Sequence, residues 1–198
     1  MQDELTRLSG PVRNGAVGAP APAGPTIASP GAGLPPPIAA HLPASVPLED
    51  LGRAPEVRGI SAWINAGPQT IAALRGKVVL VHFWTFGCFN CRNVQHYVKA
   101  WYDRYEAAGF TVIGVHTPEL SFERDLANVR QAVADQGVRF PVAFDPDYTT
   151  WNDYANRNWP AFYFVDKSGR IRTNTSVRAT TTSEQVIREL LAETAPPA

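Results

Sequence analysis

Two cysteines, Cys88 and Cys91, are the residues whose type and spacing most directly predict chemistry in this sequence. They are its only cysteines, and Phe89 and Asn90 lie between them. Two thiols three residues apart on a helix share one face and are close enough to form a disulfide. A Cys-x-x-Cys pair of this kind predicts a redox dithiol, and a scaffold held together by several disulfides is excluded.

The position of the pair in the chain indicates a different role for each thiol. Cys88 follows a predicted buried strand and lies at the start of a predicted helix, where unpaired N–H groups and the helix dipole stabilise an anion. The thiolate is the attacking species in disulfide exchange, so we expect Cys88 to attack a substrate disulfide. We expect Cys91 to be more buried and to resolve the mixed disulfide, which leaves the chain oxidised.

The same pair is also half of a metal site. His82, His96 or His116 could complete a tetrahedral zinc site with the two thiolates. We favour the redox hypothesis, because a Cys-x-x-Cys at a strand-to-helix junction within an α/β pattern is typical of redox motifs. A non-catalytic zinc-binding or interaction module stays open as an alternative.

The segments on both sides of the dithiol must position it. Residues 77–84 form a run rich in β-branched and aromatic residues, which predicts a strand buried on both faces. After Cys88, apolar residues recur at helical spacing as far as Gly109, namely Val94, Val98, Trp101 and Tyr105. The sequence thus predicts a buried strand that leads through a short loop into an amphipathic helix.

The remaining pattern alternates strands and helices. Further strands are predicted within 57–65 and at 110–115, 138–144, 161–165 and 170–177, and helices at 121–137, around 151–154 and over 186–191, with a helical turn at 69–74. Strands joined by helices, then a hairpin and a closing helix, predict an α/β domain with a mixed sheet flanked by helices. This order matches a thioredoxin fold with an inserted helix–strand unit at 121–144, whose helix Ser121 caps.

Composition divides the chain near residue 55. Residues 1–55 hold most of the 18 prolines and hardly an aromatic side chain, so we expect a disordered leader or tether there and a thioredoxin-like domain over 56–195. The 18 basic and 18 acidic residues give a formal charge of zero, which offers no overall attraction for nucleic acid. No apolar run approaches the roughly 18 residues of a spanning helix, so we expect a soluble chain from which any export signal or membrane anchor is missing.

Three segments together resemble the thioredoxin superfamily, in particular its TlpA-like and DipZ-type branch of bacterial extracytoplasmic redox domains. They are 76–85 leading to Cys88-Phe89-Asn90-Cys91, 112–119 (Val-Ile-Gly-Val-His-Thr-Pro-Glu) and 159–166 (Trp-Pro-Ala-Phe-Tyr-Phe-Val-Asp). The resemblance covers residues 55–193. It implies a thiol–disulfide oxidoreductase that acts on protein thiols and disulfides, uses no cofactor beyond its own dithiol, and exchanges electrons with an upstream donor or acceptor. It also implies a location outside the cytoplasm; because no signal peptide is visible in this chain, a cytoplasmic location is the alternative.

The same resemblance assigns substrate-binding residues. It places Pro160 in a cis-proline loop that faces the dithiol, although only about 5–6% of X-Pro bonds in folded proteins are cis, and an ordinary trans turn is the alternative. A substrate strand would pair with the backbone of Trp159. Phe89 and Asn90 would line the same substrate-binding surface.

Two residues are candidates for proton transfer. His82 lies six residues before Cys88, where many thioredoxins have a buried acid, and a neutral imidazole there could accept the proton of Cys91. A core histidine whose ring binds a backbone carbonyl is an equally good interpretation. Glu119 follows a strand end and could approach the dithiol, but the pattern slightly favours a solvated acid near the helix that Ser121 caps.

A thiol peroxidase is the main competing enzyme class, because peroxiredoxins have the same fold and a similar insertion. Their nucleophile lies in a Pro-x-x-x-Thr-x-x-Cys motif. Here Thr85 occupies the threonine position relative to Cys88, but Val81 stands where the proline would be. The sequence leaves the direction of electron flow open, since the reduction potential depends on the local field around the dithiol.

Overall fold

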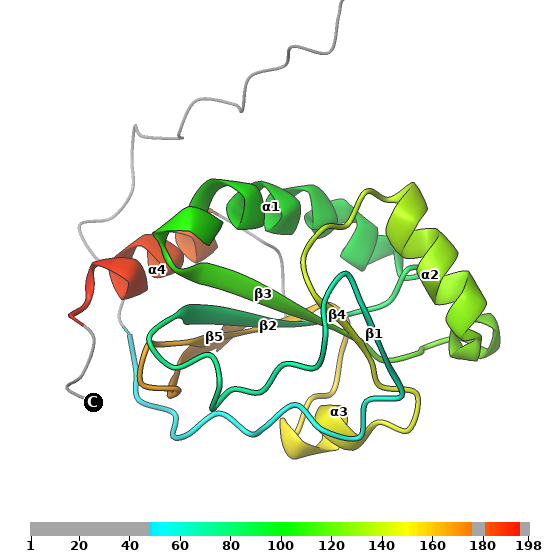
Figure 1. Ribbon diagram of the computed structural model, residues 1–198, viewed down its shortest axis with the longest axis horizontal. Coiled ribbons are helices and arrows are strands. Elements are labelled where there is room, and N and C mark those ends of the chain that lie inside the picture. Colours follow the sequence, from blue (N-terminus) through cyan, green and yellow to red (C-terminus); the bar gives the residue numbers. More distant parts are fainter. Residues whose placement is uncertain (1–47, 176–180, 195–198) are drawn as a thin grey trace, which may run out of the picture. The chain divides into compact units, whose positions relative to one another are not determined.

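The strand that leads to the dithiol lies in the middle of the sheet (Figure 1). In the computed structural model, which describes residues 48–175 and 181–194, β2 (Val78–Trp84) is parallel to β3 (Phe110–His116) and antiparallel to β5 (Ala161–Val165). Every residue of these strands is buried, as expected for apolar runs that are covered on both faces. The central strand is therefore held on both sides before the chain turns into the dithiol.

Shorter strands extend this sheet to the order β1-β4-β3-β2-β5-β6. β4 (Val142–Phe144) is parallel to β3, and β1 (Ala62–Ile64) is antiparallel to β4 at one edge. β6 (Ile171–Thr175) is antiparallel to β5. The mixed α/β sheet predicted from the order of the sequence elements is confirmed.

Helices cover both faces of the sheet (Figure 1). α1 (Phe89–Tyr105) and α4 (Thr181–Ala192) pack over the face that one set of alternate β2 side chains lines. α3 (Thr149–Asp153) covers the opposite face, where Trp151 packs edge-on against Phe83 with ring centroids 5.7 Å apart. Each face has its own apolar cluster, because successive side chains of a strand point to opposite sides. Among the described residues, no helix is both long enough and apolar enough to span a bilayer.

The inserted unit differs from its prediction at its start. Ser121 does not cap a long helix but begins a short 3-10 turn, η2 (Ser121–Arg124). The following helix, α2 (Leu126–Asp135), is capped by Asp125, whose carboxylate accepts a hydrogen bond of 2.8 Å from the backbone N–H of Ala127. Aspartate in an extended conformation is a strong N-cap, so the helix begins after Asp125 instead of at Ser121.

The strand predicted at 138–144 is reduced to β4. The carbonyl oxygens of Val138 and Phe140 instead accept hydrogen bonds from the side-chain amide of Asn65, at 2.8 and 3.1 Å. This side chain satisfies the backbone locally, so the segment before Pro141 needs no strand partner there.

Backbone pairing with the sheet extends to residues that precede residue 56, where composition places the start of the domain. Residues 49–54 run along β6: Glu49 N–H donates to the carbonyl of Arg172 at 2.8 Å, and Ile171 N–H donates to that of Gly52 at 2.9 Å. An edge strand presents unpaired backbone groups that an extended segment of any composition can satisfy. Proline content therefore did not reveal this pairing. The rest of the predicted leader, residues 1–47, lies outside the described residues.

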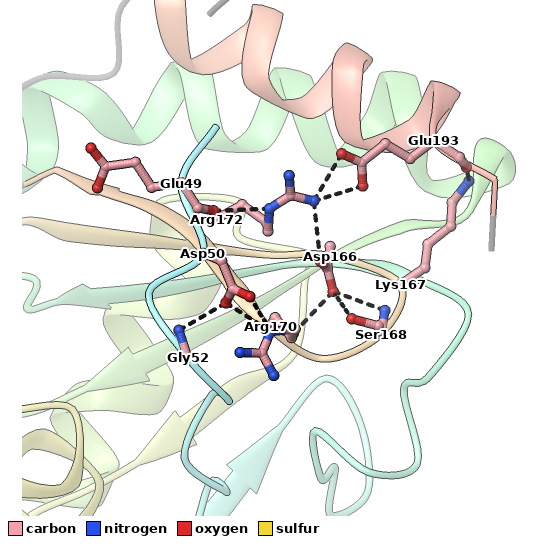
Figure 2. Close-up of polar contacts among 9 residues, drawn as sticks. All are labelled: Glu49, Asp50, Gly52, Asp166, Lys167, Ser168, Arg170, Arg172 and Glu193. Carbon is pink, nitrogen blue, oxygen red and sulfur yellow. Dashed lines mark hydrogen bonds and ion pairs between the residues drawn. The ribbon is translucent and has the colours of Figure 1, made fainter. Parts of the chain in front are cut away.

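Hydrogen bonds and ion pairs of charged side chains connect residues 49–54 and the end of α4 to the β5–β6 hairpin (Figure 2). Arg170 Nε donates to both carboxylate oxygens of Asp50, at 2.7 and 2.8 Å. Arg172 donates through Nη1 to Glu193, just beyond α4, at 2.8 Å, and through Nε to the Glu49 carbonyl at 2.9 Å. Each surface pair contributes little to stability, but together they join segments that are far apart in the sequence.

Candidate active site

Cys88 and Cys91 lie at the start of α1. Cys88 is the N-cap residue, with an extended backbone (φ −68°, ψ 121°), and its Sγ accepts a hydrogen bond of 3.4 Å from the backbone N–H of Cys91. Both residues are free thiols; Cys88 is half-buried, whereas Cys91 is 1% exposed. The sulfur of Cys88 therefore lies in the field of the helix N-terminus and stays reachable from solvent, as an attacking thiolate requires.

Cys91 belongs to the apolar core beneath α1. Burial strongly raises the pKa of its thiol; the sulfur of Cys88 and the charge of Glu119 act in the same direction, while a backbone contact with Thr85 opposes them. A thiol with a raised pKa stays protonated at neutral pH, so Cys91 becomes a nucleophile only when a base receives its proton.

The loop before β5 contains the expected cis-proline. The Trp159–Pro160 peptide bond is cis, as the resemblance implied and against the base rate for such bonds. Ala161 pairs with Phe83 in the sheet, so Pro160 lies at the end of β2 that leads to the dithiol. The indole Nε1 of Trp159 donates to the carbonyl of Thr117 at 2.9 Å, which ties this loop to the segment that follows β3.

His82 is fully buried in β2. Its ring stacks on Phe162, with centroids 4.7 Å apart, and its Nδ1 lies 3.4 Å from the carbonyl oxygen of Ala161. Burial lowers the pKa of His82 to about 4, although the Ala161 carbonyl and the Gln95 carboxamide oppose that shift. The imidazole is therefore neutral at physiological pH.

Gln95 brings a second polar group to this part of the core. It lies on α1 one turn after Cys91 and is 5% exposed. Within the described part of the chain, neither its amide nor Nε2 of His82 has a hydrogen-bond partner of normal geometry. Buried polar groups without partners are rare in folded proteins, so the two side chains form a polar spot in an otherwise apolar core.

Glu123, which the sequence pattern did not single out, is the acid most closely joined to the loop between β2 and α1. Its buried carboxylate accepts hydrogen bonds from the backbone N–H groups of Gly87 at 2.8 Å, Glu119 at 2.7 Å and Leu120 at 2.8 Å. Burial acts to raise the pKa of Glu123, but the Thr85 hydroxyl and these N–H groups outweigh it and lower the pKa. A glutamate in the third position of a helix is typical of helix N-termini, so its position in the sequence could have identified Glu123 as a capping residue.

Glu119 itself is exposed in the loop after β3. Its charge helps to raise the pKa of Cys91, so this loop lies within electrostatic range of the dithiol. A role of the Glu119 carboxylate in proton transfer stays a prediction.

His116 is a second buried histidine close to the dithiol. Its Nε2 lies 3.3 Å from the hydroxyl oxygen of Thr85, and its ring stacks on Phe86 with centroids 5.5 Å apart. Burial lowers the pKa of His116 to about 4, while the charge of Glu123 opposes that shift. This neutral ring supports the loop between β2 and α1 from the side of β3.

Large apolar side chains are exposed on both sides of this loop. Phe89, which follows Cys88 directly, is 67% exposed; Phe122 of the insertion and Leu120, just before it, are 49% and 45% exposed. Phe122 packs against Phe86, with ring centroids 5.6 Å apart. Exposed apolar side chains that gather around a reactive group indicate an interaction surface.

The described residues hold no set of three or more His, Cys, Asp or Glu side chains arranged to bind a metal ion. His82 and His116 contact the partners given above, and His96 is exposed on α1 beside Tyr97. The zinc hypothesis therefore gains no support from residues 48–175 and 181–194.

Comparison with solved structures defines the class of protein. The solution structure of a thioredoxin-like protein in the oxidized form superimposes with a TM-score of 0.65 and 29% sequence identity, over 72% of this chain and 96% of that one. The fold is thus the thioredoxin fold, with a dithiol where the central strand passes into α1. Residues 55–174 match the model of the AhpC/TSA family, and the chain belongs to that family.

Curated relatives show which members of the family this chain resembles. Protein DipZ of Mycobacterium bovis is 44% identical over 128 residues, which is 63% of this chain but only 18% of DipZ. The thiol-disulfide oxidoreductase YkuV of Bacillus subtilis is 28% identical over 118 residues, which is 60% of this chain and 79% of YkuV. The DipZ-type resemblance of the motifs is confirmed, although the chain spans less than a fifth of DipZ.

Proposed function

We propose that this chain exchanges disulfides with proteins through Cys88 and Cys91. One observation carries the proposal: Cys88, at the N-terminus of α1, is only half-buried, whereas Cys91 is fully buried. The backbone N–H of Cys91 donates to the sulfur of Cys88 at 3.4 Å. An accessible sulfur beside a buried one allows the first to attack and the second to resolve. The name of the Bacillus relative, thiol-disulfide oxidoreductase, supports the same activity.

In the reducing direction the exchange takes two steps. The Cys88 thiolate attacks one sulfur of a substrate disulfide, which breaks that bond, forms a mixed disulfide and releases a substrate thiolate that takes up a proton. Cys91 then loses its proton and attacks Sγ of Cys88, which forms the Cys88–Cys91 disulfide and releases the second substrate thiolate. Two electrons pass to the substrate, and an upstream dithiol must reduce the chain again. The same steps in reverse oxidise a substrate.

His82 accepts the proton of Cys91 in the second step. Its ring is neutral, because burial lowers its pKa to about 4, and its Nε2 forms no hydrogen bond of normal geometry with the described residues. The transfer becomes favourable only as the sulfur of Cys91 begins to bond to Cys88, since the thiol pKa is raised. Glu119, whose charge reaches Cys91, is the alternative acceptor on the solvent side.

The substrate lies across the loop of Trp159 and Pro160 and pairs with its backbone as an added strand. Phe89 and Asn90, both exposed at the start of α1, contact the residues that flank the substrate disulfide. The favoured substrate is therefore a protein disulfide in an extended and accessible segment.

Reduction of insulin by the full chain with a dithiol reductant tests this function. Cys88→Ser should abolish turnover, because the attacking sulfur is lost. Cys91→Ser should accumulate a mixed disulfide with the substrate, detectable by mass spectrometry, because nothing resolves it. Full turnover by either variant would disprove the proposal.

Hydrogen peroxide consumption separates this function from that of a thiol peroxidase. We expect little peroxidase activity, because Val81 replaces the motif proline and the Thr85 hydroxyl already interacts with His116 and Glu123. Peroxide turnover faster than insulin reduction in the same dithiol buffer would reverse the ranking of the two activities.

We also propose that the chain works outside the cytoplasm, which rests on the motif resemblance alone. Fractionation of cells that express the natural protein tests the location.

Equilibration of the dithiol with glutathione tests the direction of electron flow. A midpoint potential near about −270 mV indicates a reductant, and one near about −120 mV an oxidant.

A further inference from the structure

We propose that Glu123 is a positioning residue that fixes the loop leading to Cys88 and, through its buried negative charge, makes the Cys88–Cys91 pair a stronger reductant. The proposal rests on the disulfide exchange proposed above. Glu123 acts through Gly87, the residue before Cys88, to which it is joined by a hydrogen bond of 2.8 Å.

The geometry at Gly87 is built around this carboxylate. A Cβ atom added to Gly87 would lie 2.6 Å from Oε1 of Glu123, closer than real Cβ atoms approach, and in a tight contact of 3.3 Å with Cζ of Phe122. Glycine therefore allows the carboxylate to approach the loop backbone directly. The second oxygen, Oε2, accepts the N–H groups of Glu119 and Leu120 at 2.7 and 2.8 Å. One carboxylate thus joins the loop after β2 to the loop after β3.

The partners of Glu123 hold it in place without neutralising it. They are backbone N–H groups and the Thr85 hydroxyl, none of which carries a full positive charge. The adjacent Arg124 is exposed and donates instead to the carbonyl of Pro146 at 3.0 Å. A buried anion is screened less by solvent and salt than an exposed one, and Gly87, to which this anion is hydrogen-bonded, directly precedes Cys88.

The field of this anion opposes the helix N-terminus at Cys88. A like charge nearby disfavours a thiolate, and only the reduced form of the pair carries one. Glu123 therefore destabilises the reduced form relative to the disulfide, which makes the reduction potential more negative. Among the described residues, His116, which is neutral, and Glu119, which is exposed and acts on Cys91, also face this region.

Glu123→Gln tests the proposal, because it removes the charge and keeps the size of the side chain. We expect the equilibrium with glutathione to shift about tenfold toward the dithiol, which corresponds to a midpoint potential about 30 mV less negative. The pH profile of Cys88 alkylation by iodoacetamide should move to lower pH, because the thiolate is no longer repelled. Glu123→Asp, which keeps the charge, should restore most of both values even where its melting temperature falls.

Asp125→Asn is the matched control. It removes one negative charge from the same insertion, but this charge is exposed, and asparagine is as good an N-cap as aspartate. Its potential and alkylation profile should equal those of the wild type. A Glu123→Gln variant that behaves like this control, or shifts in the opposite direction, would show that Glu123 is only structural.

A second comparison covers the case in which Glu123→Gln does not fold. Glu123→Asp keeps the charge but draws the carboxylate back from Gly87, so its potential should lie slightly on the less negative side of the wild type, and a potential more negative than that of the wild type would contradict the proposal. Insulin reduction by the wild type is measured in parallel. Its absence would disprove the function, whereas an active wild type with an unshifted variant would disprove only the role of Glu123.

Discussion

The two buried histidines beside the dithiol make stability depend on pH. An unfolded chain has histidine pKa values near ~6.5, whereas burial lowers the pKa of His82 and of His116 to about 4. Between these values the unfolded chain binds more protons than the folded one. The free energy of unfolding is therefore highest above about pH 6.5 and falls as the pH falls toward about 4.

His82→Phe should remove one of these two contributions. Phenylalanine keeps the stacking on Phe162 but does not titrate, so the loss of unfolding free energy between about pH 7 and about pH 5 should shrink by about 2 kcal/mol. Urea unfolding at both pH values measures this. An unchanged pH dependence in His82→Phe would contradict the lowered pKa of His82. If His82 also receives the proton of Cys91, the same variant should resolve mixed disulfides more slowly.

At the scale of the elements, the start of α2 distinguishes what the sequence suggested from what the structure shows. Asp125→Ala should lower the free energy of unfolding by about 1 kcal/mol, because the bond from Ala127 N–H to the cap is lost. Ser121→Ala should change it by less than about 0.5 kcal/mol, since Ser121 caps no helix. Urea unfolding measures the free energy of unfolding of both variants. A larger loss for Ser121→Ala than for Asp125→Ala would mean that the helix begins at Ser121, as the sequence pattern predicts.

At the scale of the whole molecule, residues 49–54 close the free edge of β6 and connect it to α4 through Arg172, Glu49 and Glu193. A chain that begins at residue 56 should therefore have a free energy of unfolding about 1 to 3 kcal/mol lower than a chain that begins at residue 48. The shorter chain loses the backbone hydrogen bonds of the segment, and the entropy that ordering the segment costs offsets part of this loss. Thermal melting of both chains measures the difference. Insulin reduction should be equal in the two, because the segment contacts β6 and not the dithiol. Equal melting temperatures would show that the segment adds no stability.

The sequence by itself determined the parts of this protein that depend on local pattern. The apolar run of β2, the helical spacing after Cys88 and the distance between the two cysteines are properties of neighbouring residues, and they led to the thioredoxin fold and the dithiol. The three motifs determined the family resemblance and the cis bond before Pro160, both of which the comparisons and the structure confirm.

Only the tertiary structure decided the contacts between segments that are distant in the sequence. The carboxylate of Glu123 reaches Gly87, 36 residues away, and Asp50 binds Arg170, 120 residues away. Periodicity cannot predict such pairs, because it reports which face of an element is apolar and not which loops the packed sheet brings together. The dithiol could thus be found from two residues, whereas the buried charge that acts on it could be found only once β2 and β3 lay side by side.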